Sequence, residues 1–391
     1  MSRLADLIKE LCPDGVEYKP LGEVAELKRG QSITKKSITP GDIPVIAGGR
    51  KPAYFTSSAN RTGMTIVVAG SGAYAGFVSY WDQPIFVSDA FSVKVNEEIL
   101  VPRFTYHWVC GKQKELYSLK SGGGVPHVYP KDVAKFKCPI PPLEVQCEIV
   151  RILDQFTTLE AELEAELEAR RAQYEYYRNQ LLSYDALVSR CPNGVQYKSI
   201  GSFSKCVAGA TPNSKNPSLW DGDIPWMSSG EVNKKTVYST NRFITQLGFD
   251  SCSTKMVPAG AVVIALAGQG KTRGTVARIR IELCTNQSLC AIITDKTVDS
   301  DYLFHYLSGQ YDNLRAVSSG DGTRGGLNLK MIRAYKVPVP PIEEQRRIAD
   351  VLDRFDTLVN DISSGLPAEI AARRAQYEYY RDRLLSFPEK K

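Results

Sequence analysis

The 391-residue chain has few of the side chains that build metal sites or disulfide frameworks in a recognisable pattern. It contains three histidines, His107, His127 and His305, and its nine cysteines include no C-x-x-C pair. Zinc sites and disulfide-stapled domains usually show such spacings. We therefore expect free, buried thiols and no metal site.

Long hydrophobic runs are also missing. No apolar stretch approaches the length of a membrane span, and residues 1–10 contain no signal-peptide core. The sequence therefore predicts a cytoplasmic protein with no membrane partner. Its 43% hydrophobic and 24% charged residues are ordinary for a globular chain of two or more domains, and the net charge of +6 permits nucleic-acid binding without establishing it.

Several catalytic signatures are absent. There is no Asn-Pro-Pro-Tyr of an adenine methyltransferase, no G-x-S-x-G and no H-E-x-x-H. Residues 265–272, Ala-Leu-Ala-Gly-Gln-Gly-Lys-Thr, approximate a phosphate-binding P-loop, but Gly274, Thr275 and Val276 favour a turn and a strand where a P-loop needs a helix. The equivalent residues 70–76 keep the glycines and lack Lys-Thr. We predict a glycine-rich turn between strands, and a binding protein rather than an enzyme.

The feature that organises the chain is a duplication. Ala-Arg-Arg-Ala-Gln-Tyr-Glu-Tyr-Tyr-Arg occupies residues 169–178 and again 372–381. Upstream, Pro-Pro-x-Glu-x-Gln occurs at 141–146 and 340–345. The Pro-Pro pair and the following glutamate favour a helix start, so each segment is predicted to form one long helix.

Apolar residues alternate at spacings of three and four from Ile149 to Tyr184, except at Glu160 and Arg170, and a similar series runs from Ile348 to Leu384. This is the pattern of a coiled-coil seam. Gly365 and Pro367 interrupt the second seam and predict a kink there. Because the same helix occurs twice, the two copies can pair about a pseudo-two-fold axis.

The remaining sequence repeats in the same order. Cys-Pro-x-Gly-Val-x-Tyr-Lys occurs at 12–19 and 191–198, and Gly-Asp-Ile-Pro at 41–44 and 222–225. Each half is thus a globular block followed by a helix. Strands are expected at 65–69, 85–87, 91–95, 261–266, 276–281 and 291–294, with short helices at 104–109 and 302–307, so each block is mixed α+β. The predicted divisions are 1–142, 143–189, 190–341 and 342–391.

Long loops rich in Gly, Ser, Lys and Arg separate these elements. They cover residues 28–39, 48–60, 119–127, 208–219, 228–238 and 318–325. Loops of this length inside a compact domain are usually functional.

These motifs resemble a known family. Trp220-Asp-Gly-Asp-Ile-Pro-Trp226 after Thr211-Pro-Asn213, then Pro-Pro-x-Glu-x-Gln and a helix ending in Gln-Tyr-Glu-Tyr-Tyr-Arg, are similar to the specificity (S) subunit of type I restriction–modification systems. The resemblance covers essentially the whole chain. The first half departs from the pattern, with Val45 in place of Trp226 and no Thr-Pro-Asn approach, which leaves its loop conformations open.

The resemblance implies an α+β fold in which two long antiparallel coiled-coil helices, the central and C-terminal conserved regions, hold apart two target recognition domains. Each domain would read one half of a bipartite double-stranded DNA site. Two modification subunits would carry S-adenosylmethionine and methylate adenine, and two restriction subunits would bring ATP, magnesium and cleavage. The chain itself would bind no cofactor and perform no chemistry. The alternatives are a coiled-coil scaffold and a P-loop-type NTPase.

Basic, amide and aromatic side chains on the long loops are the candidates for DNA contact. Arg and Lys can bind guanine O6 and N7, and Asn or Gln can pair with adenine N6 and N7. The candidates are Lys35, Lys36, Arg50, Lys51, Tyr74, Lys120 and His127 in the first block, and Asn213, Lys215, Lys234, Lys235, Gln269, Lys271, Arg273 and Arg324 in the second. We expect Arg273 and Arg324 to affect only the second half-site.

Overall fold

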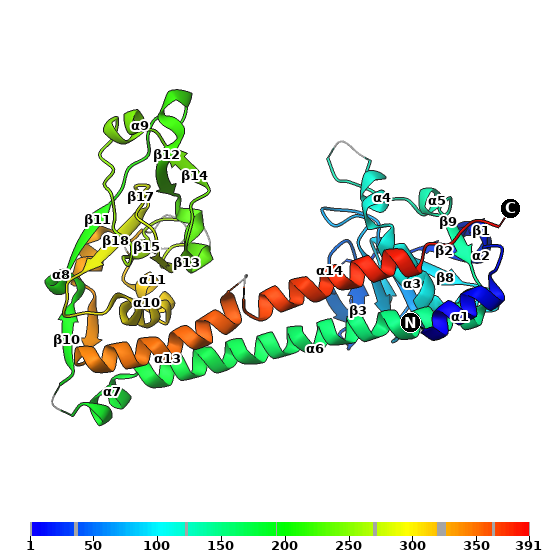
Figure 1. Ribbon diagram of the computed structural model, residues 1–391, viewed down its shortest axis with the longest axis horizontal. Helices are drawn as coiled ribbons and strands as arrows, with labels where there is room; N and C mark the ends of the chain where they lie inside the picture. The colour runs from blue at the N-terminus through cyan, green and yellow to red at the C-terminus, as the bar shows by residue number, and fades with distance from the viewer. Residues whose placement is uncertain are drawn as a thin grey trace. The chain divides into compact units, whose positions relative to one another are not determined.

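The computed structural model describes residues 2–34, 38–121, 124–192, 194–268, 272–318, 326–361 and 364–390. The chain divides into two compact units, Met1–Glu164 with Glu369–Lys391, and Ala165–Ala368. Each unit contains one globular block and a part of both long helical segments (Figure 1).

The first unit is mixed α+β. Its elements are α1 (Ser2–Leu11), β1 (Glu17–Pro20), α2 (Leu21–Val24), β2 (Ala25–Arg29), β3 (Ile43–Ile46), β4 (Tyr54–Thr56), β5 (Thr65–Ala69), β6 (Val78–Trp81), β7 (Phe86–Val87), β8 (Ala90–Val95), α3 (Pro102–Gly111), α4 (Gln113–Ser118), α5 (Pro130–Val133), β9 (Lys137–Ile140), the first part of α6 (Leu143–Leu182) and most of α14 (Leu366–Leu384). Its sheets have the orders β2-β8-β5-β6, β4-β3-β7 and β1-β9.

The second unit repeats this plan with additions. Its elements are the rest of α6, α7 (Tyr184–Arg190), β10 (Gln196–Ser199), α8 (Ile200–Phe203), β11 (Ser204–Ala208), η2 (Pro217–Leu219), β12 (Trp220–Met227), η3 (Ser229–Lys234), β13 (Thr236–Val237), β14 (Arg242–Ile244), α9 (Gln246–Asp250), β15 (Val262–Ala265), β16 (Val276–Ile279), β17 (Cys284–Thr285), β18 (Leu289–Thr294), α10 (Ser300–Ser308), α11 (Tyr311–Ala316), α12 (Leu329–Ala334), β19 (Lys336–Val339) and α13 (Ile342–Asn360).

The sheets of the second unit have the orders β11-β18-β15-β16-β13, β14-β12-β17 and β10-β19. Apart from the added β13, each matches its counterpart in the first unit, which confirms the predicted internal repeat. The central strands β5 and β15 are buried along their whole length because helices and sheet cover both faces. The predicted short helices lie inside α3 and α10.

The first long segment forms one continuous helix, α6, of 40 residues, as predicted. The expectation of a single kinked helix in the second segment is wrong, since α13 ends at Asn360 and α14 begins at Leu366. A side chain at position 365 would lie 2.5 Å from the carbonyl oxygen of Thr357, so the chain passes too close for any residue but glycine. Pro367 has no N–H to continue the helical ladder and sits in the first turn of α14.

The long helices pair antiparallel within each unit. In the first unit, Phe156 of α6 stacks on Tyr380 of α14 with ring centres 5.3 Å apart, while Glu160 accepts a 2.7 Å hydrogen bond from Arg374. Positions rising along α6 therefore meet positions falling along α14 (Figure 1). In the second unit, Tyr177 stacks on Phe355 of α13 at 5.7 Å.

The P-loop-like stretch lies between two paired strands. β15 and β16 pair antiparallel, and Gly274 N–H donates a 2.9 Å hydrogen bond to the carbonyl of Ala265. Within the described residues 266–268 and 272–275, no helix separates β15 from β16, as a turn between strands predicts. Lys271 and Gln269 lie outside the described residues.

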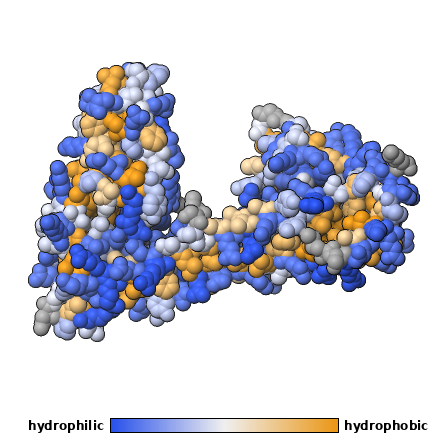
Figure 2. Space-filling view, in the orientation of Figure 1, coloured by the Kyte–Doolittle hydropathy of each residue, from blue (hydrophilic) through white to orange (hydrophobic). Residues whose placement is uncertain are grey.

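The visible face of each unit is mainly hydrophilic, with smaller apolar areas between polar ones (Figure 2). In the described ranges, no helix combines the length and the apolarity needed to cross a membrane.

Candidate nucleic-acid interface

A buried histidine joins the first block to the helices. His107 of α3 has Nε2 2.8 Å from a carboxylate oxygen of Asp154 in α6 and Nδ1 2.7 Å from the hydroxyl of Tyr377 in α14. Burial lowers the pKa of His107, which favours the neutral ring. A neutral imidazole has one N–H, which Asp154 must accept, and Nδ1 therefore accepts from Tyr377. Burial opposes ionisation of Asp154, but hydrogen bonds from His107 and Arg103 hold its pKa low.

The second block uses the same arrangement. His305 of α10 has Nε2 2.7 Å from an oxygen of Asp353 in α13 and Nδ1 3.0 Å from the hydroxyl of Tyr174 in α6. Although burial opposes it, hydrogen bonds from His305 and Arg278 lower the pKa of Asp353 to about 2. Tyr174 and Tyr377 occupy the same place in the duplicated sequence. Each block thus binds the aspartate of its own half and the tyrosine of the other half.

The cation beside this aspartate comes from different elements in the two units. Arg103 of α3 pairs with Asp154 at 2.7 Å, whereas Arg278 of β16 pairs with Asp353 and lies 3.0 Å from Asp301 of α10. The equivalent aspartate therefore pairs with an arginine in both units, although the two arginines come from different positions of the fold. The blocks therefore share a docking frame that tolerates variation around it.

The glutamine of Pro-Pro-x-Glu-x-Gln fastens the start of each helix. Gln146 is fully buried, accepts a 2.8 Å hydrogen bond from Val101 N–H, and donates to the carbonyls of Ile99 (2.8 Å) and Pro141 (2.7 Å). Gln345 makes the three equivalent bonds in the second unit. This motif is therefore structural, and it fixes α3 and α10 relative to α6 and α13.

The motif Trp-Asp-Gly-Asp-Ile-Pro-Trp anchors one loop of the second block. The indole N–H of Trp220 donates to the carbonyl of Asn213 (3.2 Å), and that of Trp226 donates to Ala210 (3.0 Å). The two rings pack edge to face at 5.1 Å, and the guanidinium of Arg242 lies 3.6 Å above Trp220. Loop 208–219 is therefore held onto β12. In the first block Val45 replaces Trp226 and cannot donate such a bond.

Five predicted contact residues of the first block gather around the turn that follows β5. Arg50 lies 5.1 Å above the ring of Tyr74, Lys120 donates a 3.2 Å hydrogen bond to the carbonyl of Ala73, and His127 pairs with Ser71 in a β-bridge. Lys51 follows Arg50 and is exposed. Lys35 and Lys36 lie outside the described residues. The fold thus brings three separate loops together into one polar surface.

In the second block the predicted contact residues lie on different loops. Asn213 and Lys215 are exposed on loop 208–219, where the Asn213 side chain accepts from Lys215 N–H at 3.1 Å. Lys234 donates to Glu231 (2.9 Å), to Asn241 (2.8 Å) and to a backbone carbonyl, which uses all three of its donors.

Two further candidates of the second block are withdrawn from solvent. Burial lowers the pKa of Lys235, and Arg273 is only 7% exposed. Lys234, Lys235 and Arg273 are thus already bonded within the protein or largely buried, and their contact with DNA stays a prediction. Arg324, like Gln269 and Lys271, lies outside the described residues.

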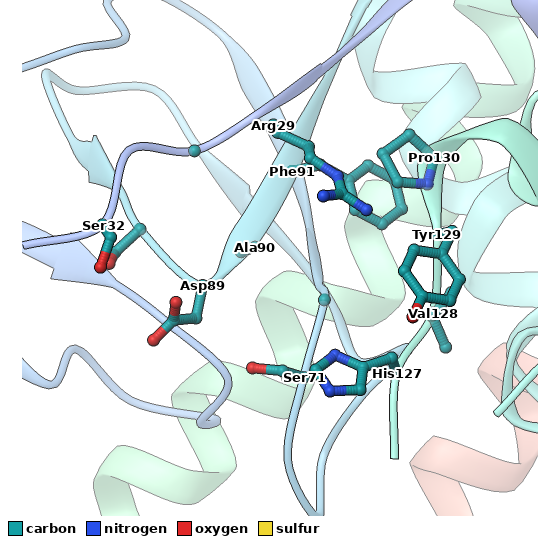
Figure 3. A pocket seen from close by; sticks show the side chains of 13 residues that line it. Arg29, Ser32, Ser71, Asp89, Ala90, Phe91, His127, Val128, Tyr129 and Pro130 are labelled. Atoms are coloured by element: carbon teal, nitrogen blue, oxygen red, sulfur yellow. The ribbon is translucent and has the colours of Figure 1, made fainter. Parts of the chain in front are cut away.

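A recess of about 390 Å³ opens beside the polar surface of the first block. Arg29, Ser71, Asp89, His127 and Tyr129 are among its lining residues (Figure 3). Of these, sequence reasoning singled out His127 alone. Arg29 falls in the predicted loop 28–39, although it ends β2, and Asp89 falls between two predicted strands. Nothing in the sequence indicated that the two residues lie close together.

A repeated frame that presents two unlike loop surfaces defines a two-domain recognition protein. The family described as "Type I restriction modification DNA specificity domain" matches residues 13–169 and 192–372, and the chain belongs to this family. It is thus a type I specificity subunit, the non-catalytic component that recognises the DNA target.

Individual relatives are similar to this chain over nearly its whole length. The Escherichia coli type I restriction enzyme EcoR124I/EcoR124II specificity subunit is 33% identical, over 99% of this chain and 98% of the relative. A putative type I restriction enzyme specificity subunit from Haemophilus influenzae is 30% identical, covering 95% and 96%. A type I S subunit structure from M. genitalium shares the fold, with a TM-score of 0.62 at 17% identity over 95% of this chain and 96% of that chain.

Proposed function

We propose that the two blocks read separate halves of a bipartite site on duplex DNA. The observation that carries this proposal is the pairing of one frame with two loop sets. Apart from the added β13, the strand order is the same in both blocks, and so is the His–Asp–Tyr docking, whereas the loops differ in length, anchoring and charge. The backbone of duplex DNA has two-fold pseudo-symmetry, which a repeated frame can match, and unlike loops can then read unlike sequences.

The partners follow from membership of the family. We infer that two modification subunits bind the chain, carry S-adenosylmethionine and methylate an adenine in each half-site. Two restriction subunits would join them and supply ATP- and magnesium-dependent translocation and cleavage. The specificity subunit positions these enzymes on the target and holds none of their cofactors.

In the first block the proposed DNA contacts are Arg50, Lys51, Tyr74, Lys120 and His127. They combine cations with aromatic faces on loops that meet at the turn after β5. Arg50 is exposed and braced by its ring contact, so its guanidinium is presented with less loss of side-chain freedom. In the second block the proposed contacts are the exposed Asn213 and Lys215. The contacts that stay predictions are Lys35, Lys36, Lys234, Lys235, Gln269, Lys271, Arg273 and Arg324.

The test is to co-express the chain with its modification subunit and to map methyladenine across a genome by long-read sequencing. We expect one motif made of two specified halves with an unspecified spacer, and an adenine methylated in each half. The modification subunit expressed without the chain is the control and should leave no such motif. An uninterrupted motif, or the same motif without the chain, would refute the proposal.

A further inference from the structure

The recess of the first block has fixed walls. The N–H of Gly70 donates to the carbonyl of Asp89 (3.0 Å), and the Gly70 carbonyl accepts from Val128 N–H (3.0 Å). On the opposite strand, Gly30 N–H donates to the carbonyl of Ala90 (2.9 Å). Backbone hydrogen bonds therefore hold the ends of β2, β5 and β8 together, so a ligand would meet a preorganised site.

Two opposite charges line this recess without forming an ion pair. Arg29 and Asp89 are both exposed, and the guanidinium of Arg29 lies 5.4 Å from the ring centre of Tyr129 (Figure 3). Across the described ranges, no salt bridge involves either side chain. A forked donor and a carboxylate acceptor thus remain available to one ligand.

This combination favours a base pair over a phosphate. A phosphate would bind Arg29 but would be repelled by the carboxylate of Asp89. In the major groove, guanine presents two acceptors, O6 and N7, which suit a guanidinium, and its paired cytosine presents the N4 amino donor, which suits a carboxylate. An A·T pair offers no pair of acceptors on one base, so it matches the recess less well.

We propose that this recess reads a G·C base pair of the first half-site, with Arg29 donating to guanine O6 and N7 and Asp89 accepting from cytosine N4. The inference rests on the proposed function and adds a base identity to it.

The second block differs at the same place. The register of β11 with β18 puts Ala208 where the register of β2 with β8 puts Arg29. The same register puts Ser288 where Asp89 stands, and its carbonyl accepts from Leu266 N–H (2.8 Å) as the Asp89 carbonyl accepts from Gly70 N–H. Neither charge of the first recess is therefore repeated, and G·C recognition through this pair belongs to the first half-site.

The experiment uses the full chain assembled with its modification subunit and compares the methylated motifs of variants. Arg29→Gln and Asp89→Asn should each lower discrimination at one base pair, the same one in both variants, by about ten- to a hundred-fold. The second half-site should be unchanged, and its methylation also reports that the variant is folded and assembled. Lys94→Gln and Asp82→Asn, which remove exposed charges of the same block outside the recess, should leave the motif intact.

The outcomes separate the two proposals. A wild-type complex without a bipartite motif would overturn the proposed function. A bipartite wild-type motif that both variants retain unchanged, or variants that relax different base pairs, would overturn the recess proposal alone. If a variant methylates nothing, competition among short duplexes that differ only at the G·C pair decides, because equal weakening for all duplexes would show a phosphate contact and refute base reading.

Discussion

The exchange of tyrosines between the two halves predicts that Tyr377→Phe will destabilise the first unit, although Tyr377 belongs to the second copy of the duplicated sequence. The change removes the hydroxyl that donates to His107 Nδ1 at 2.7 Å and leaves a buried acceptor without a partner. Such a loss costs about 1–3 kcal/mol. For a unit of this size each kcal/mol lowers Tm by about 2–4 °C, so the transition of the first unit should fall by about 2–12 °C.

Hydrogen exchange followed by mass spectrometry can assign the effect to a unit. In Tyr377→Phe, the amides of α3 should exchange faster while those of α10 keep their protection, and Tyr174→Phe should show the reverse. Tyr379→Phe is the matched control, since Tyr379 lies on the same helix and is 58% exposed. Faster exchange in α10 after Tyr377→Phe, or no change in either helix, would refute the conclusion that each block docks on the tyrosine of the other half.

Three further predictions follow from the same contacts. Gln146→Ala should destabilise the first unit by about 3 kcal/mol or more in denaturant unfolding, because it leaves three buried backbone groups without partners, each costing about 1–3 kcal/mol; a wild-type midpoint would contradict the role of the motif. Because the pKa of Asp353 is about 2 in the folded chain and 3.8 ordinarily, its contribution is complete above pH 4 and is lost as pH falls towards 2; thermal melts of Asp353→Asn should depend less on pH in that window, and an equal dependence would exclude Asp353 as the cause. Nine residues separate Leu159 from Ala169, but thirteen separate Leu358 from Ala372. Adding four residues within 160–168 lengthens α6 by about 6 Å, against roughly 3.4 Å per base pair. Methylation mapping should therefore show a spacer one or two base pairs longer with unchanged half-sites, and an active variant with the original spacing would refute the helix as a ruler.

Local patterns were sufficient for most elements of the fold. The apolar run at residues 65–69 forms β5 as predicted, because a buried central strand needs little beyond β-branched side chains and flanking glycines. The starts of α6 and α13 lie directly after the Pro-Pro pairs. The break between α13 and α14 was expected only as a kink, since sequence marks Gly365 and Pro367 but not the carbonyl groups that crowd position 365.

The candidate site was predictable as a set of loops and much less as a set of side chains. Arg50 and Lys234 are both cations in predicted loops. In the structure Arg50 is exposed and lies above an aromatic ring, whereas Lys234 donates hydrogen bonds to Glu231, Asn241 and a backbone carbonyl. Composition cannot distinguish them, because Lys234 becomes structural only when its own loop folds and brings acceptors three to seven positions away around its ammonium group.

The sequence by itself determined the duplication, the long helices and the family, because these depend on identity and periodicity along the chain. Only the tertiary structure decided which tyrosine bonds to the buried histidine of which block. His107 and Tyr377 are 270 positions apart, and they meet because α6 and α14 run antiparallel. It also decided that Arg29 and Asp89 share a recess, since hydrogen bonds between strand ends, and not their distance in sequence, bring them together.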